Sequence, residues 1–281
     1  MHQRSSFPRP SAWVNWLGCL ATLAIQGISA SLADVPTAVV TRQVVAEGLA
    51  HPWDIAFLSD QAALVTEKDG TIMHVDLRSG QLSVVRGVPG DLDNERLDDP
   101  RDNSGLFGIA LDPDFAREPW VYVAYSAGDE TGTRLKVVRA RWQGEAAYGL
   151  SSMETLLVVE PPSTDRFHYG GGIAFGGDGK LYVTAGERVF DEIDQPALPL
   201  AQDVTDMRGK IYRLHKDGAI PTDNPPLGDG AAAGVYALGI RAAQGLTRHP
   251  TSGALWFTEH GSVQGDEVNI LRPGANYGWP V

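Results

Sequence analysis

The stretch of residues 172–187, GIAFGGDGKLYVTAGE, shows the pattern that decides the fold. Two short apolar runs, residues 173–175 and 181–184, flank the turn-forming residues 177–179, Gly-Asp-Gly. Short runs of β-branched and aromatic residues separated by Gly and Asp predict a β-hairpin. His168 and three glycines precede the first predicted strand, and Glu187 follows the second.

The same hairpin pattern recurs along the chain, with a small residue inside the first strand and Thr-Glu or a close equivalent after the second. The four copies are marked by Ile55, Ile109, Ile173 and Leu246, at steps of 54, 64 and 73 residues. A repeated unit of strands predicts an all-β fold of the β-propeller type. The steps exceed the roughly 40 to 50 residues of a minimal blade, so the excess is expected in loops.

Two acidic, turn-rich insertions account for part of this excess. Residues 88–104 carry six Asp or Glu side chains, and residues 188–209 carry five. Long loops on one face of a propeller are where binding sites are built, so both insertions are candidates to cover a pocket. The alternative is that each is a solvated surface loop.

Composition limits the classes of partner. The chain has 281 residues, 43% of them hydrophobic, which is enough to bury a sizeable core in one domain. Its net charge of -12 argues against nucleic acid as a partner, because phosphate binding needs clustered Lys and Arg.

The amino terminus resembles a secretory signal. Basic residues precede an apolar stretch that ends near Ile28, and the small residues of 31–33 follow. We therefore predict a signal peptide over residues 1–33 and a mature propeller domain over residues 34–281, periplasmic or secreted, with no stable membrane insertion after cleavage. An uncleaved anchor and lipidation at Cys19 are the alternatives. The predicted mature chain has no cysteine, so disulfides cannot hold the fold.

His168 and Arg241 are the side chains with the clearest chemical potential. An imidazole titrates near neutrality, and Glu187 at the end of the adjacent strand is expected to orient it, which suits a general base. The glycines at 170–172 are expected to let a flat cofactor approach the backbone. The alternative is that His168 bonds a loop carbonyl and that the glycines serve a bulge. Arg241 suits a carboxylate ligand, or else is a solvated surface arginine.

In combination, several motifs resemble the glucose/sorbosone dehydrogenase family over roughly residues 45–281. They lie at residues 166–175, 239–246, 265–269 and 276–280. Two departures stand out: Gly172 occupies an arginine position of the family motif H-x-G-G-R, and Ala242 replaces the asparagine of G-H-R-N-x-Q-G-L. The resemblance implies a six-bladed β-propeller. In the family a last blade follows the motif that ends here at Pro280, so we expect a truncated chain with about five blades.

The resemblance also implies a site. His168 would be the general base, with pyrroloquinoline quinone as the cofactor. Asn103, Arg241 and Gln244 would contact the quinone. The carbonyls of Gly261 and Ser262, together with Glu267 and Tyr277, would serve a calcium ion (Ca2+). Other interpretations are a turn asparagine for Asn103, a capped turn or an ion pair with Arg272 for Glu267, and a packing aromatic for Tyr277.

The implied activity is oxidation of the anomeric hydroxyl of an aldose sugar, dependent on pyrroloquinoline quinone (PQQ) and calcium, with electrons passing to an external acceptor. Two alternatives from other classes stay open. One is a non-catalytic propeller that binds a partner, and the other is a calcium-dependent hydrolase of the lactonase type.

Overall fold

The computed structural model describes residues 40–94, 102–189 and 199–280. The predicted signal peptide, and the middle of each acidic insertion, lie outside the described residues. Residues 43–281 form one compact unit. In the described part of this unit, all regular structure is β-strand, and no helix has the length and apolarity to cross a membrane.

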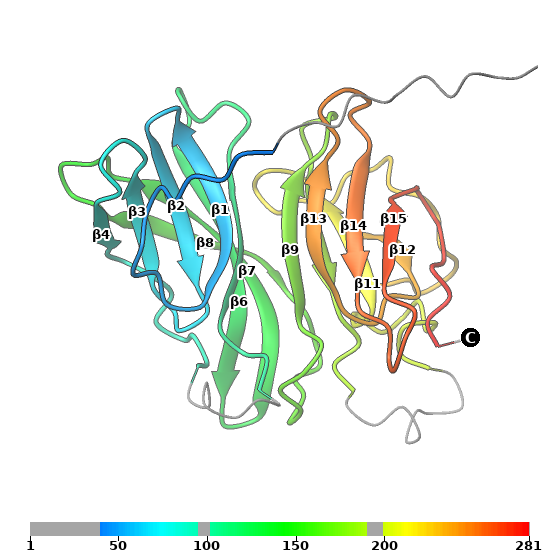
Figure 1. Cartoon of the computed structure of the whole chain (residues 1–281). Coiled ribbons are helices and arrows are strands. Elements are labelled where there is room, and N and C mark those ends of the chain that lie inside the picture. Colours follow the sequence, from blue (N-terminus) through cyan, green and yellow to red (C-terminus); the bar gives the residue numbers. More distant parts are fainter. Residues whose placement is uncertain (1–39, 95–101, 190–198, 281) are drawn as a thin grey trace, which may run out of the picture. The chain divides into compact units, whose positions relative to one another are not determined.

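Within the described ranges, fifteen strands form four antiparallel sheets, each built from consecutive segments of the chain (Figure 1). The first sheet contains β1 (Pro52–Ser59), β2 (Ala62–Glu67), β3 (Ile72–Asp76) and β4 (Leu82–Val85). The second contains β5 (Leu106–Leu111), β6 (Trp120–Asp129), β7 (Gly132–Trp142) and β8 (Leu150–Val158). The third contains β9 (Gly170–Phe175), β10 (Leu181–Ala185), β11 (Lys210–Leu214) and β12 (Val235–Leu238). The fourth contains β13 (Ala243–Arg248), β14 (Leu255–Glu259) and β15 (Glu267–Ile270).

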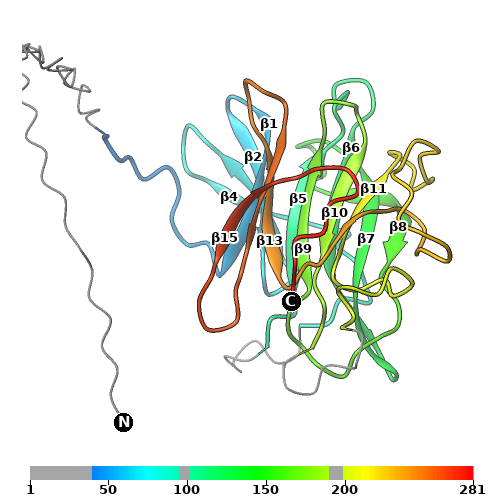
Figure 2. The ribbon, with the colours of Figure 1, turned by 90° about the vertical axis from the view of Figure 1, so that its right-hand side faces the viewer.

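The sheets are arranged as propeller blades, which confirms the predicted fold class. The first strands of successive sheets pack on one another, β1 on β5, β5 on β9 and β9 on β13, and they lie together near the middle of the view in Figure 2. The expected number of about five blades is wrong, because the described residues form four. Each sheet corresponds to one of the four copies of the hairpin repeat.

Apolar side chains between neighbouring sheets form the core. One cluster, which includes Leu64, Leu106 and Val123, lies between the first and second sheets. A second, which includes Tyr122 and Tyr212, joins the second and third sheets. Strands β2 and β10 are buried at every residue, because each is covered on both faces by neighbouring strands or sheets. Burial of apolar surface between blades is therefore the main source of stability.

Two buried threonines join adjacent sheets by hydrogen bonds. The Thr66 hydroxyl donates to the Phe107 carbonyl of the next sheet at 2.7 Å, and Thr184 donates to the Ala243 carbonyl at 2.7 Å. Each hydroxyl oxygen also accepts from a main-chain N–H in the first strand of its own sheet. One small side chain thus satisfies buried backbone groups in two blades, which fixes the spacing of the central strands.

Candidate functional site

The predicted site residues Asn103, His168 and Arg241 lie just before β5, β9 and β13. These three strands are the first strands of successive sheets and pack side by side. The propeller therefore brings three residues, separated by 65 and 73 positions in sequence, to the same end of the central strands.

The register of one strand pair places Glu187 beside His168. Ala185 of β10 pairs with Gly170 of β9, so the residue two positions after β10 faces the residue two positions before β9. The Glu187 Oε1 atom lies 3.4 Å from His168 Nδ1, and the Glu187 side chain is fully buried. The imidazole is 11% exposed, and His168 has a φ of 48°, in the left-handed region. The structure thus brings together the predicted base and its predicted orienting carboxylate.

The histidine–glutamate pair adjoins Arg241. The Glu187 N–H donates to the Arg241 carbonyl at 2.9 Å, across the boundary between the third and fourth sheets. The Arg241 guanidinium donates to the carbonyls of Gly261 at 2.7 Å and His260 at 3.2 Å, and its centre lies 5.1 Å from the centroid of the Trp279 ring. Arg241 is therefore a buried side chain of the site, and the alternative of a solvated surface arginine is wrong.

Glu259 belongs to the same cluster, although it was not predicted as a site residue. It ends β14, and its Oε1 atom accepts a hydrogen bond from the Arg241 N–H at 2.5 Å. Its Oε2 atom is buried and has no hydrogen-bond partner in the part of the chain that the structure describes. Burial raises the pKa of Glu259 to about 7, and the charges of Glu267 and Glu187 add to this effect. The Thr-Glu ending of the repeat was the available sequence signal for this residue.

The glycines at 170–172 lie where neighbouring strands leave no space for a side chain. A Cβ atom on Gly170 would lie 2.7 Å from the Thr184 carbonyl oxygen, and one on Gly172 would lie 2.5 Å from the Gln244 carbonyl oxygen. A Cβ atom on Gly171 would overlap the Phe107 side chain. These glycines are thus required for close packing of β9 against its neighbours. The predicted approach of a flat cofactor to this backbone stays a prediction.

The predicted calcium residues line one pocket of about 250 Å³ beside Arg241. It includes Gly261, Ser262, Glu267 and Tyr277, together with Glu259 and Trp279. The Tyr277 hydroxyl already donates to the Ile270 carbonyl at 2.8 Å and accepts from the Arg272 N–H at 2.9 Å. Its ring packs edge-on against Phe257, so the packing role considered for Tyr277 is present.

The donor atoms of this pocket fit a hard cation. The lining residues offer main-chain carbonyl and carboxylate oxygens, and within the described residues the buried Oε2 of Glu259 has no hydrogen-bond partner. Among the described residues, no group of three or more His, Cys, Asp or Glu side chains is placed to hold a metal, so a cation here would depend on carbonyls. The Gly261 carbonyl is bonded to Arg241, and that bond would have to open for the same oxygen to bind calcium.

A carboxylate-bearing quinone also fits beside Arg241, on condition that a cation is present. Arg241 is the one cationic side chain among the pocket-lining residues, while Glu259 and Glu267 line the same space. A divalent cation would offset this negative charge and leave the planar guanidinium to pair with a carboxylate.

Part of the first acidic insertion supports the segment that carries His168. Asp93 and Asp102 are buried, and both contact the Arg166 guanidinium, with oxygen–nitrogen distances of 2.7 and 3.2 Å. The Asn103 N–H donates to the Arg166 carbonyl at 2.8 Å. For these residues the interpretation as a solvated loop is wrong, because their carboxylates are internal ion-pair partners. Sequence reasoning missed Arg166, since its partners are more than 60 positions away.

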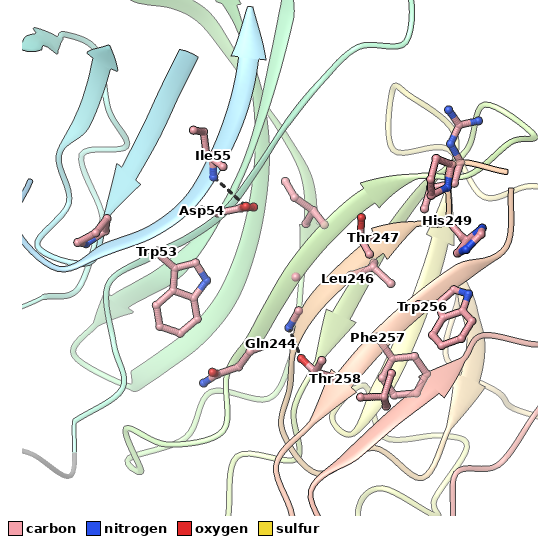
Figure 3. Close-up of a pocket in the computed structure, with 17 residues that line it drawn as sticks. Trp53, Asp54, Ile55, Gln244, Leu246, Thr247, His249, Trp256, Phe257 and Thr258 are labelled. Atoms are coloured by element: carbon pink, nitrogen blue, oxygen red, sulfur yellow. Dashed lines mark hydrogen bonds between the residues drawn. The ribbon is translucent and has the colours of Figure 1, made fainter. Parts of the chain in front are cut away.

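A groove of about 900 Å³ lies between β1 and the pair β13–β14. Figure 3 shows Trp53 from β1 and Gln244 from β13 extending into it from opposite sides. The Gln244 Oε1 atom lies 3.1 Å from His260 Nε2, so this predicted cofactor residue joins the groove to the pocket beside Arg241. His168 does not line the pocket beside Arg241. It is connected to that pocket through Glu187, which contacts the imidazole and donates its N–H to the Arg241 carbonyl.

The chain is similar to several known sugar dehydrogenases. It is 35% identical over 259 residues to the aldose sugar dehydrogenase of Escherichia coli, covering 90% of this chain and 65% of that protein. It is 30% identical over 257 residues to quinoprotein glucose dehydrogenase B of Acinetobacter calcoaceticus, covering 85% of this chain and 52% of that protein. This chain therefore spans less than two thirds of the length of these relatives.

A solved structure gives the same result. The PQQ-bound aldose sugar dehydrogenase of Streptomyces coelicolor matches with a TM-score of 0.69 and 32% identity, over 85% of this chain and 65% of that one. The family model described as Glucose / Sorbosone dehydrogenase matches residues 49–281, which include all four sheets and every predicted site residue. The chain belongs to the glucose/sorbosone dehydrogenase family.

Proposed function

We propose that this chain carries the base and part of the cofactor site of a dehydrogenase that oxidises the anomeric hydroxyl of aldose sugars with PQQ and calcium. The contact of His168 with the buried Glu187, directly beside Arg241, is the observation that carries the proposal. The family and the relatives named above support it.

His168 would take the proton of the sugar hydroxyl. Because Nδ1 faces Glu187, the Nε2 atom is left to accept this proton. The buried carboxylate holds the ring in one orientation and stabilises the imidazolium once it has formed. Loss of the hydroxyl proton and of a hydride from the same carbon converts the aldose to its lactone, a two-electron oxidation.

The bound quinone would supply the acceptor for the hydride, and an external electron acceptor would then receive the two electrons. Arg241 would pair with a quinone carboxylate, and Asn103 and Gln244 would add polar contacts. The Gly261 and Ser262 carbonyls, Glu267 and Tyr277 would serve the calcium ion. We also propose a periplasmic or secreted location, on the basis of the signal-like sequence of residues 1–33.

Reconstitution tests this function. The purified chain is mixed with calcium, quinone, glucose and a redox dye, and dye reduction is followed against mixtures that lack one component. Dye reduction that requires both calcium and quinone is expected. Quinone that binds, measured by calorimetry, without any dye reduction for a series of aldoses would contradict the proposal.

A non-catalytic propeller is the second candidate, and one contact favours it. The Arg241 guanidinium is bonded to the Gly261 carbonyl, so the side chain proposed to hold the quinone and the carbonyl proposed to hold calcium satisfy each other. If this contact persists, neither ligand enters. Failure of both calcium and quinone to bind in calorimetry would favour this candidate. No contact of the described residues supports the lactonase alternative, and hydrolysis of a sugar lactone without quinone would be the observation in its favour.

A further inference from the structure

Arg188, which directly follows Glu187, is a buried arginine that the proposed chemistry does not use. Its side chain is 3% exposed, and its backbone has a φ of 64°. Burial lowers the pKa of Arg188 to about 10, so the guanidinium stays charged at neutral pH. A buried cation costs free energy unless its donors are satisfied, so its contacts indicate what it is for.

The contacts of Arg188 surround the segment that carries His168. Nε donates to the Phe167 carbonyl at 2.7 Å, and Nη2 donates to the Asp165 carbonyl. The guanidinium lies over the ring of Tyr169, with its centre 3.6 Å from the ring centroid. The residues on both sides of His168 are therefore held by one side chain.

Thr133 fixes the position of the guanidinium itself. Nη1 donates to the Thr133 carbonyl at 3.2 Å, and Nη2 donates to its hydroxyl at 2.8 Å. The same hydroxyl accepts a hydrogen bond from the Tyr169 hydroxyl at 2.7 Å. Because Thr133 belongs to β7 of the second sheet, Arg188 ties the segment before β9 to a neighbouring blade.

We propose that Arg188 is a positioning residue for His168. Glu187 orients the imidazole ring, and Arg188 fixes the backbone on either side of it, including the left-handed φ at His168 that no β-strand would impose. Two consecutive residues after β10 thus position the ring and the main chain of one histidine. The catalytic consequence rests on the proposed function, while the effect on the backbone does not.

The main experiment measures backbone amide exchange of residues 165–169 by mass spectrometry in the full chain. Arg188→Gln removes the charge and the fork of donors, and exchange in this segment is expected to be at least tenfold faster. Arg188→Lys keeps the charge without the fork, and about a threefold increase is expected. Arg213→Gln is the matched control, because Arg213 is also a buried arginine, bonded to Asp178 and Asp223 instead. It should leave residues 165–169 unchanged.

If sugar oxidation is established, kinetics add a second readout. Arg188→Gln is expected to lower kcat by at least tenfold with KM within a factor of two, because the base and not the sugar site is displaced, and Arg188→Lys is expected to restore part of the loss. Equal loss of kcat in Arg213→Gln would contradict a specific role. Absence of any wild-type activity would count against the proposed function and leave the exchange result decisive for Arg188.

If Arg188→Gln folds and its residues 165–169 exchange at the wild-type rate, the proposal is overturned. Should that variant fail to fold, Thr133→Val decides, because it removes the hydroxyl that orients Nη2 and keeps the arginine. Faster exchange at residues 165–169 is expected in Thr133→Val, and unchanged exchange there overturns the proposal.

Discussion

Three glutamates lie at or just beyond the ends of the second strands of their sheets, and they have different partners. Glu67 and Glu259 each accept a hydrogen bond from a main-chain N–H just before the first strand, at Ala50 and Arg241. Glu187 lies in the corresponding place and contacts an imidazole. The carboxylate that accepts this hydrogen bond in two blades thus contacts His168 in a third.

We expect His168→Asn to lower the rate of sugar oxidation by about 10²- to 10⁴-fold, the usual contribution of a general base. The reason is that asparagine keeps a polar side chain but cannot take the hydroxyl proton. Dye-reduction kinetics measure the change. His249→Asn is the control, because His249 accepts hydrogen bonds in a surface turn at Thr251 and Ser252. An active His168→Asn protein would rule out His168 as the base.

Because the Lys210 side chain is buried, we expect the free energy of unfolding to depend on pH. Lys210 is fully buried, with Nζ donating to the carbonyls of Leu200 at 2.8 Å and Arg208 at 2.6 Å, and burial lowers its pKa to about 8. Between pH 8 and the ordinary lysine value near 10.5, the unfolded chain binds more protons than the folded one, so the Lys210 contribution to stability rises with pH. This contribution of Lys210 to stability is lost as the pH falls through 8.

Urea unfolding at pH 7 and pH 9.5 measures this effect. The free energy of unfolding of the wild type, relative to Lys210→Met, is expected to be about 2 kcal/mol more favourable at pH 9.5 than at pH 7. Lys180→Met is the control for general effects of pH, because Lys180 lies in the turn between β9 and β10. A constant difference between wild type and Lys210→Met at both pH values would refute a lowered pKa.

At the scale of the strands, the hydrogen bonds that buried threonine hydroxyls donate between blades lead to a further prediction. Thr184→Val removes the donor to the Ala243 carbonyl and the acceptor of the Gly172 N–H, both buried, and should cost about 1–3 kcal/mol of unfolding free energy. Thr258 has the corresponding place in β14 but is exposed. Thr258→Val should therefore change stability by less than about 0.5 kcal/mol. Chemical denaturation gives both values, and equal costs would contradict a role for the bond between blades.

For the assembled propeller, calcium binding should be visible as a gain in stability. A ligand that binds the folded state and is present at 100 times its Kd adds about 2.7 kcal/mol, which is about 5–10 °C in Tm for a domain of this size. Differential scanning calorimetry with calcium or with chelator measures the shift. Glu267→Gln should reduce it, and Glu118→Gln, a surface partner of Arg141, should not. An unchanged Tm in saturating calcium would indicate that the hydrogen bond from Arg241 to the Gly261 carbonyl persists and that calcium does not bind there.

Local sequence patterns predicted most of the fold. Each sheet contains one hairpin copy, and the copies are marked by Ile55, Ile109, Ile173 and Leu246. These hairpins were predictable because a strand or a turn depends on the pattern of a few neighbouring residues. The number of blades was wrong because it was inferred from the family and not from a repeat. The contact of His168 with Glu187 was also predictable, since a hairpin register relates residues that flank two adjacent strands.

Contacts between sheets could not be predicted in this way. The contacts of Arg166 with Asp93 and Asp102, and of Arg188 with Thr133, join residues more than 50 positions apart in different strands or connecting segments. Nothing in a local pattern specifies which blade meets which loop. The close packing around the glycines at 170–172 could not be predicted for the same reason, because the atoms that crowd them come from β5, β10 and β13.

The amino-acid sequence was sufficient to determine the strands, the turns and the family, because these depend on short-range periodicity and on motifs that keep their order along the chain. The three-dimensional packing determined which carboxylates pair with Arg166, which arginines are buried, and which carbonyl Arg241 engages. These outcomes depend on burial and on distances between blades, and both quantities exist only once the sheets have assembled around the central strands.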